Sequence, residues 1–334
     1  MTSRVVIRRQ GEARRAAVAD FPFGEDDVRA VSRRLDEPAW LLDYRLGAWQ
    51  VFRDLPMPSL SDEAWRRTDL RGLPSGDVKV RPADEGSIDP EFVQPLVGER
   101  HGALLTVRPG RPARAEISVP LPAQGVIFTD WATAVSRPPQ GFQAALDRVL
   151  RPKEGKFAAL AAALAGDGVV VWVPPRTEVA APLHSVLWAP GARAAFFTRV
   201  LVVVGEGSHL TFVHETASPT EAEGQAVHAG LVSLDVGPEA QVTFVELQSW
   251  GEHVWNFTHE RARLDRQAHL NWIFGAVGSH LTKNFTELDL AGEGSVGRMS
   301  GFYFSDGVQH LDHDTQQNHL APHTTSDLLF KGAL

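Results

Sequence analysis

The side chains best suited to chemistry lie in one run near the end of the sequence. This run holds four of the 13 histidines and two aspartates: His310, Asp312, His313, Asp314, His319 and His323. Spacings of three and four would place imidazoles on one face of a helix, where they could hold a metal ion. Pro322 and the neighbouring threonines favour strand and turn instead, where those spacings do not converge. The sequence therefore predicts no metal site formed by this chain.

The two aspartates of this run leave an enzymatic alternative open. In a strand, Asp312 and Asp314 point to the same side, and paired carboxylates act as general acid and base in glycoside chemistry. A β-solenoid polysaccharide lyase or hydrolase would use this pair together with a histidine. In a purely structural interpretation, the same side chains form hydrogen-bonded ladders between neighbouring strands. A third alternative, a cupin-like metal barrel, would need an H-x-H spacing that the sequence lacks.

Composition and missing motifs exclude several other functions. The formal net charge of -8 argues against nucleic-acid binding, which draws on concentrated lysine and arginine. No apolar run is long enough for a membrane span, and the chain contains no cysteine, which fits a reducing compartment. The sequence has neither a P-loop nor a G-x-S-x-G nucleophile elbow. We expect a cytoplasmic protein that binds no membrane and hydrolyses no nucleotide itself.

A repeat is the element that must position the histidine run. Apolar residues recur at steps of 27, 32, 28 and 26 residues, at Leu183, Leu210, Val242, Leu270 and Val296. Such periods are typical of stacked units, each too small to bury its own apolar face. Within the units, side chains alternate as in strands, and the matched faces are Leu210, Phe212 and His214, then Val242, Phe244 and Glu246. Gly297 and Arg298 break the alternation in the last unit. The pattern predicts a β-solenoid over residues 166–334.

The residues before the repeat predict a helical region over 1–77 and an irregular, partly β lead-in over 78–165. One helix begins at Glu37 and Pro38 and ends at Pro56, with its apolar stripe on Leu41, Tyr44, Ala48, Val51 and Leu55. A second, shorter helix opens at Ser61 and carries Trp65. Alternation over residues 103–130 predicts strands, and residues 141–150 and 156–164 predict a helical hairpin. The recurring tryptophans are interpreted as core or interface anchors: Trp172, Trp188, Trp250, Trp255 and Trp272.

Four segments carry a resemblance to a known family. They are EPAWLLDYR at residues 37–45, EAWRRTDL at 63–70, the helix-to-strand segment at 156–174, and HLAPHTTSD with FKGAL at 319–334. In order and wording they resemble the SufB and SufD proteins of the SUF iron–sulfur cluster assembly system, in the SufD form. The resemblance covers nearly the whole chain. It implies a right-handed parallel β-helix with flanking helical parts, in agreement with the repeat.

The resemblance also implies a function and partners. It identifies the chain as a non-catalytic scaffold subunit that pairs with a SufB-like paralogue through the β-helices, while a SufC-like ATPase hydrolyses ATP. The family's CSHGA-type motif and its SufC-binding helices would follow Leu334, so the chain is expected to be C-terminally truncated, and its cluster ligands cannot be mapped. Without a thiolate, this chain alone is expected to bind no cofactor, and an iron–sulfur cluster would form only in the assembled complex.

The histidine run is then the predicted interface end of the coil. We take His310, His313, His319 and His323 as interface candidates, with no catalytic and no metal-binding residue assigned. An uncovered sheet edge can also pair with a second copy of itself, so a homodimer remains an alternative.

Overall fold

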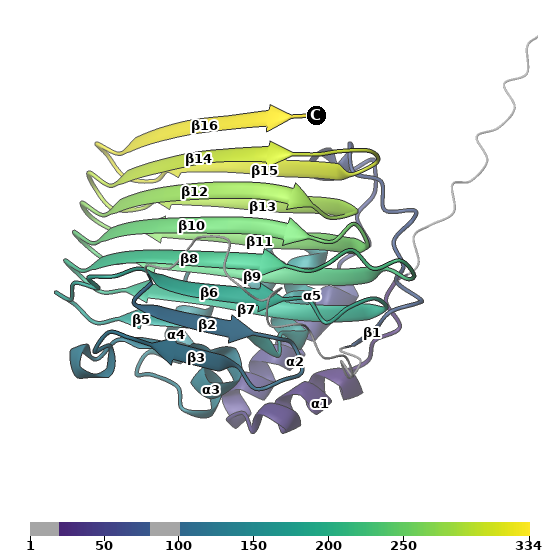
Figure 1. Ribbon diagram of the computed structural model, residues 1–334, viewed down its shortest axis with the longest axis horizontal. Helices are drawn as coiled ribbons and strands as arrows, with labels where there is room; N and C mark the ends of the chain where they lie inside the picture. Colours follow the sequence, from purple (N-terminus) through teal and green to yellow (C-terminus); the bar gives the residue numbers. More distant parts are fainter. Residues whose placement is uncertain (1–19, 81–100) are drawn as a thin grey trace, which may run out of the picture.

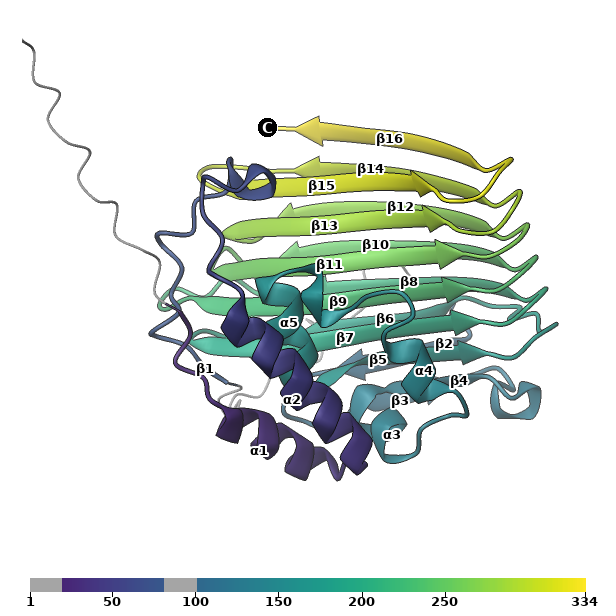
Figure 2. The same ribbon diagram turned by 180° about the vertical axis from the view of Figure 1, so that it is seen from behind.

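The chain winds into a coil of two facing sheets. A computed structural model describes residues 20–80 and 101–334. Residues 1–19 of the predicted helical region and residues 81–100 of the predicted lead-in lie outside the described part. Strands alternate between the sheets over about six turns (Figure 1). In Figure 1 the front strands run to the right and the rear strands to the left as the coil rises, so the coil is right-handed, and the view from behind agrees (Figure 2). The predicted mainly β solenoid is confirmed.

The first sheet, called sheet A, consists mainly of parallel strands. Its order is β15-β13-β11-β9-β7-β5-β4, and β1 also pairs with β7. The bounds are β1 Lys79–Val80, β4 Ile127–Asp130, β5 Asp167–Val173, β7 Ala194–Val204, β9 Ala226–Val236, β11 Val254–Leu264, β13 Leu281–Leu290 and β15 His310–His319. Only the β4–β5 pair is antiparallel among the described strands of this sheet.

The second sheet, sheet B, lies opposite. Its order is β16-β14-β12-β10-β8-β6-β2-β3. The bounds are β2 Ala103–Val107, β3 Arg114–Ile117, β6 Leu183–Trp188, β8 His209–Ala217, β10 Gln241–Trp250, β12 His269–Gly278, β14 Val296–Phe304 and β16 Thr325–Ala333. β3 pairs antiparallel to β2, and the remaining pairs are parallel. The strands predicted between residues 103 and 130 are β2, β3 and β4.

The register confirms the repeat at its centre and corrects it at both ends. Leu210, Val242 and Leu270 occupy equivalent positions on neighbouring strands. Leu183, however, pairs with Phe212 instead of the predicted Leu210. Val296 pairs with His269 instead of the predicted Leu270, and Gly297 takes the place opposite Leu270. A shift of one residue exchanges the two faces of a strand, so Gly297 rather than Val296 faces the interior.

The broken alternation at this position has a packing reason. A Cβ atom on Gly297 would lie 2.2 Å from Cδ2 of Leu288, a fully buried residue of the opposite sheet. The glycine leaves the space that this leucine fills.

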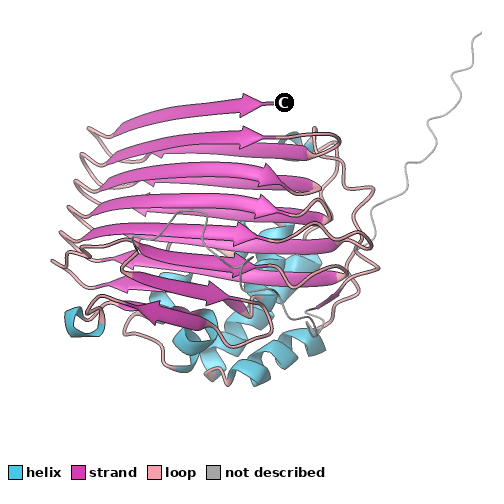
Figure 3. Cartoon of the chain, in the orientation of Figure 1, coloured by secondary structure: helices cyan, strands magenta, loops and turns pink. Residues whose placement is uncertain are grey.

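The helices gather over the outer face of sheet A at the N-terminal end of the coil (Figures 2 and 3). They are α1 Glu25–Leu35, α2 Ala39–Asp54, α3 Trp131–Ser136, α4 Phe142–Leu146 and α5 Lys156–Leu164. The short 3₁₀ turns are η1 Glu63–Trp65, η3 Pro122–Gln124 and η4 Pro152–Glu154, and η1 lies beside β15 at the other end of the coil. All nine residues of α5 are buried, because this alanine-rich helix lies between α2 and strands β7 and β9. In the part that the structure describes, none of α1 to α5 covers the outer face of sheet B (Figure 1).

The helix predictions are confirmed in part. The predicted helix after Pro38 is α2. Its buried stripe includes Leu41 and Ala48, as predicted, and is completed by Arg45, Trp49 and Phe52. The prediction of a second helix was wrong, since only the single 3₁₀ turn η1 forms around Trp65. In the hairpin, α5 has its predicted bounds and α4 is shorter than predicted. Four of the five tryptophans taken as anchors are buried: Trp188, Trp250, Trp255 and Trp272.

Candidate functional site

The histidine run forms β15, the last strand of sheet A, and the turn after it. His310 and Asp312 point outward to the segment that follows η1. The Nε2 atom of His310 lies 3.2 Å from Oγ1 of Thr68, and this hydroxyl also donates to Asp312. Asp312 pairs with Nζ of Lys283 on β13 at 3.0 Å, and the side chain of Lys283 is almost fully buried. Thr68 belongs to the EAWRRTDL segment of the family resemblance, so this segment contacts the histidine run.

His313 points the other way, into the coil. Its ring packs against Phe274 of β12 and Tyr303 of β14, with ring centroids 4.9 and 5.9 Å away. Burial lowers the pKa of His313 to about 4, so the imidazole is neutral at pH 7. Its Nε2 atom is buried without a hydrogen-bond partner.

His319 and His323 lie at the turn between β15 and β16. His319 contacts Oγ1 of Thr324 through Nδ1 at 2.6 Å and Oγ of Ser326 through Nε2 at 2.9 Å. His323 is exposed and has a positive φ of 59°. The four histidines therefore do not lie together: His310 is on the outer face, His313 is in the interior, and His319 and His323 are at the turn. Within residues 20–80 and 101–334, no three histidine, aspartate or glutamate side chains form a group that could hold a metal ion.

Asp312 and Asp314 line a shallow hollow of about 260 Å³ beside η1. Its other charged residues are Glu63, Arg66, Arg67 and Lys283. Asp312 is held by an ion pair with the buried Lys283 and accepts a hydrogen bond from the hydroxyl of Thr68. This arrangement fits a structural ion pair better than it fits a general acid.

A second polar cluster, which the sequence analysis did not single out as a site, lies inside the coil. His228 of β9 contacts Oγ1 of Thr198 through Nε2 at 2.8 Å and Oδ1 of Asn256 through Nδ1 at 2.6 Å. His214 of β8 contacts Oγ of Ser185 at 2.8 Å. Burial lowers the pKa of His214 to about 3 and that of His228 to about 4, so both rings are neutral at pH 7.

Two buried glutamates complete this interior cluster. Glu246 of β10 and Glu260 of β11 lie within hydrogen-bonding reach of each other. Nε1 of Trp272 donates to Glu246 at 3.3 Å, and Asn284 and Thr286 donate to Glu260 at 2.7 and 2.9 Å. Burial raises the pKa of Glu260 to about 7 and, with the charge of Glu260, raises that of Glu246 well above its ordinary value.

The alternation of inward-facing and outward-facing residues in the sequence already contained a signal for this interior cluster. His214 and Glu246 continue the inward-facing series of Leu210 with Phe212 and of Val242 with Phe244. A polar residue in an apolar series marks a buried polar position. The pattern could not reveal Glu260 as its neighbour, because that residue belongs to the other sheet.

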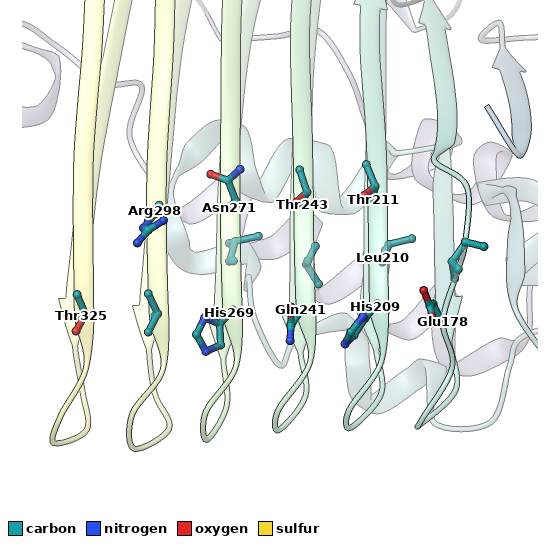
Figure 4. A pocket seen from close by; sticks show the side chains of 15 residues that line it. Glu178, His209, Leu210, Thr211, Gln241, Thr243, His269, Asn271, Arg298 and Thr325 are labelled. Carbon is teal, nitrogen blue, oxygen red and sulfur yellow. The ribbon is translucent and has the colours of Figure 1, made fainter. Parts of the chain in front are cut away.

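The outer face of sheet B carries a long polar hollow of about 680 Å³ near the start of its strands (Figure 4). One row across the strands contains Glu178, His209, Gln241, His269 and Thr325, and a second contains Thr211, Thr243, Asn271 and Arg298. The rows offer hydrogen-bonding groups of mixed charge. They form a polar surface and do not converge on one reacting atom.

The C-terminal end of the coil is open in the described part of the chain. β15 pairs only with β13, and β16 pairs only with β14. Large apolar side chains are exposed at this end: Phe302, Phe304, Leu320, Leu328 and Leu329, each between 45% and 62%.

The helices of the described residues include none that is both long and apolar enough to cross a membrane.

Comparison with known proteins gives one consistent result. Residues 187–334 match the family model for the SUF system FeS cluster assembly SufBD core domain. The chain is 26% identical over 319 residues to iron–sulfur cluster assembly protein SufB of Bacillus subtilis, which covers 91% of this chain and 67% of that protein. SufBD family proteins of Staphylococcus haemolyticus and Staphylococcus aureus are 26% and 25% identical over 322 residues, covering 92% of this chain and 68% of each relative. These matches support the resemblance read from the motifs without separating SufB from SufD.

Proposed function

We propose that this chain, whose residues 187–334 match the SufBD core domain model, is a SufD-like, non-catalytic scaffold subunit of a cytoplasmic SUF iron–sulfur cluster assembly complex. In this proposal it pairs with a SufB-like paralogue, and a SufC-like ATPase supplies the energy of ATP hydrolysis. The matches to the family model and to SufB support the role in cluster assembly.

The proposed pairing rests on the family match and on the continuous parallel strands of both sheets, whose last described members are β15 and β16. Within the described residues, Phe302, Phe304 and Leu329 each expose about half of their surface near these strands. A partner β-helix could add strands to both edges and cover these side chains. The interface candidates His310, His319 and His323 lie on the same terminal strand and turn, and His313 lies just inside it.

The chain's own residues support a scaffold that holds no cluster alone. Thiolates are the usual ligands of iron–sulfur clusters, and the sequence has no cysteine. In the proposed complex the partner supplies the thiolates. The continuous parallel ladders of both sheets make a stiff body, which could pass a movement driven by the ATPase to the interface.

Co-purification with a SufB-like and a SufC-like protein tests this proposal. We expect the unaltered chain to retain the SufB-like partner, and the double variant Phe304→Lys with Leu329→Lys to lose it, because two charges would be buried against the partner. Ile117→Lys is the matched control, since Ile117 is 49% exposed on β3 at the other end of sheet B. Equal retention of the partner by all three chains would exclude the open end as the interface.

The histidines of the turn have a separate test. We expect His323→Ala to weaken pairing with the SufB-like partner or to lower cluster assembly by the complex. If pairing and assembly are both unchanged, His323 is not part of the interface.

A further inference from the structure

The interior pair of Glu246 and Glu260 needs a counter-charge. The two residues are 6% and 2% exposed, and they line the same small cavity from strands of opposite sheets. Two ionised carboxylates in contact inside a protein repel strongly, because little solvent screens them. A cationic side chain, a metal ion or a proton must therefore offset one of the charges.

Among the residues that the structure describes, the side chains around the pair supply no cation. Arg261 follows Glu260 on β11, and Lys283 lies on the adjoining strand β13, but both point to the outer face of sheet A. There Lys283 pairs with Asp312, and Arg261 pairs with Glu154 and Glu287.

The interior histidines supply none either. The titratable groups facing the cluster are His214 from β8, His228 from β9 and His313 from β15, and burial keeps all three neutral at pH 7. The faces of β12 and β13 contribute Trp272, Phe274, Asn284 and Thr286, which carry no charge.

A metal ion is not supported by the donor set. Among the residues that the structure describes, no third histidine, aspartate or glutamate joins the pair in a metal-binding arrangement. The cavity beside the pair measures about 20 Å³, which is room for about one water molecule.

We propose that Glu246 and Glu260 hold one shared proton between their carboxyl groups, and that release of this proton loosens the middle turns of the coil. The proton links β10 of sheet B to β11 of sheet A through a hydrogen bond across the interior. Its loss leaves two anions that face each other with only neutral donors around them. The inference does not depend on the proposed role in cluster assembly.

The sign of the pH effect follows from the raised pKa values. An unfolded glutamate releases its proton near pH 4.5, whereas burial raises the pKa of Glu260 to about 7 and that of Glu246 well above its ordinary value. The folded state therefore binds more protons in this range, and raising the pH favours unfolding. Near and above pH 7, where histidines contribute little, the unfolding constant should rise up to about tenfold per pH unit until the folded pair has released the proton.

The test compares the full chain with Glu246→Gln and Glu260→Gln between pH 6.5 and 8.5. A glutamine donates a hydrogen bond to the remaining carboxylate without a titrating proton, so we expect the rise of the unfolding constant with pH to disappear in each variant. Glu239→Gln is the control, because Glu239 is exposed and paired with Arg266 on the surface; it should keep the wild-type pH dependence. Persistence of the wild-type dependence in both interior variants would overturn the proposal.

A second measurement needs no variant to fold. Difference infrared spectroscopy of the unaltered chain should show the band of a protonated carboxyl group at pH 6.5, and this band should fade as the pH is raised to 8.5. Absence of a protonated carboxyl band at pH 6.5 would also overturn the proposal.

Discussion

Replacing Arg45 by methionine should strongly destabilise the fold. Arg45 of α2 makes a two-point ion pair with Glu37, with Nε and Nη2 at 2.7 and 2.5 Å from the carboxylate oxygens. It also donates to the backbone oxygens of Ala163 and Ala165 at the end of α5, at 3.1 and 2.7 Å. The two charged side chains are 1% and 0% exposed. This single guanidinium group therefore joins the surface helix to the buried helix.

The magnitude follows from what the substitution leaves behind. Removing one partner of a buried ion pair costs about 3–5 kcal/mol, because the remaining charge stays buried without compensation. The two carbonyl groups would also lose a donor, at about 1–3 kcal/mol for a group left unsatisfied. These terms are not additive, so we expect Arg45→Met to lower the free energy of unfolding by about 4–5 kcal/mol.

Urea unfolding followed by circular dichroism measures this effect. The control is Arg29→Met, since Arg29 pairs with Glu25 on the exposed face of α1, and we expect a loss below about 0.5 kcal/mol. Combining Arg45→Met with Glu37→Gln should regain part of the stability, because it removes the orphaned charge. A loss below about 1 kcal/mol for Arg45→Met, or a double variant less stable than the single one, would refute this reasoning.

Two further predictions concern the coil. Gly297→Val should destabilise the protein by about 1–3 kcal/mol through overpacking against Leu288, and adding Leu288→Ala should restore part of this in urea unfolding; an unchanged midpoint for Gly297→Val would contradict the interior placement. Acid should also unfold the coil. Burial lowers the pKa of five histidines to about 3 or 4: His214, His228, His253, His259 and His313. The unfolded state therefore binds more protons below pH 6.5, and stability falls as the pH falls. At pH 5.5 each of them except His253, which is the least enclosed, should contribute a loss of about 1.4 kcal/mol, offset in part by the glutamate pair. A urea midpoint that stays constant between pH 7 and 5 would contradict this prediction.

Much of the architecture could be predicted from the sequence because its signals are local. Side chains in a strand alternate with a period of two, so the series around Leu210 and Val242 indicates both strands and their inward faces. The steps of about 30 residues indicate stacking, because a single unit cannot bury its own face. Helix α2 after Pro38 and the alanine-rich α5 were predictable for the same reason, since their patterns lie within one helix each.

The surroundings of the polar residues depend on pairing that the sequence does not display. His310 and His313 differ in parity along β15, so one contacts Thr68, which is 242 residues away in the sequence, and the other faces the interior. Glu246 and Glu260 become neighbours only because their strands lie in opposite sheets.

The sequence by itself thus determined that the chain forms a stack of strands preceded by a helical region. The tertiary structure alone decided which polar side chains share a buried space, because contacts between distant segments depend on the register of every turn between them.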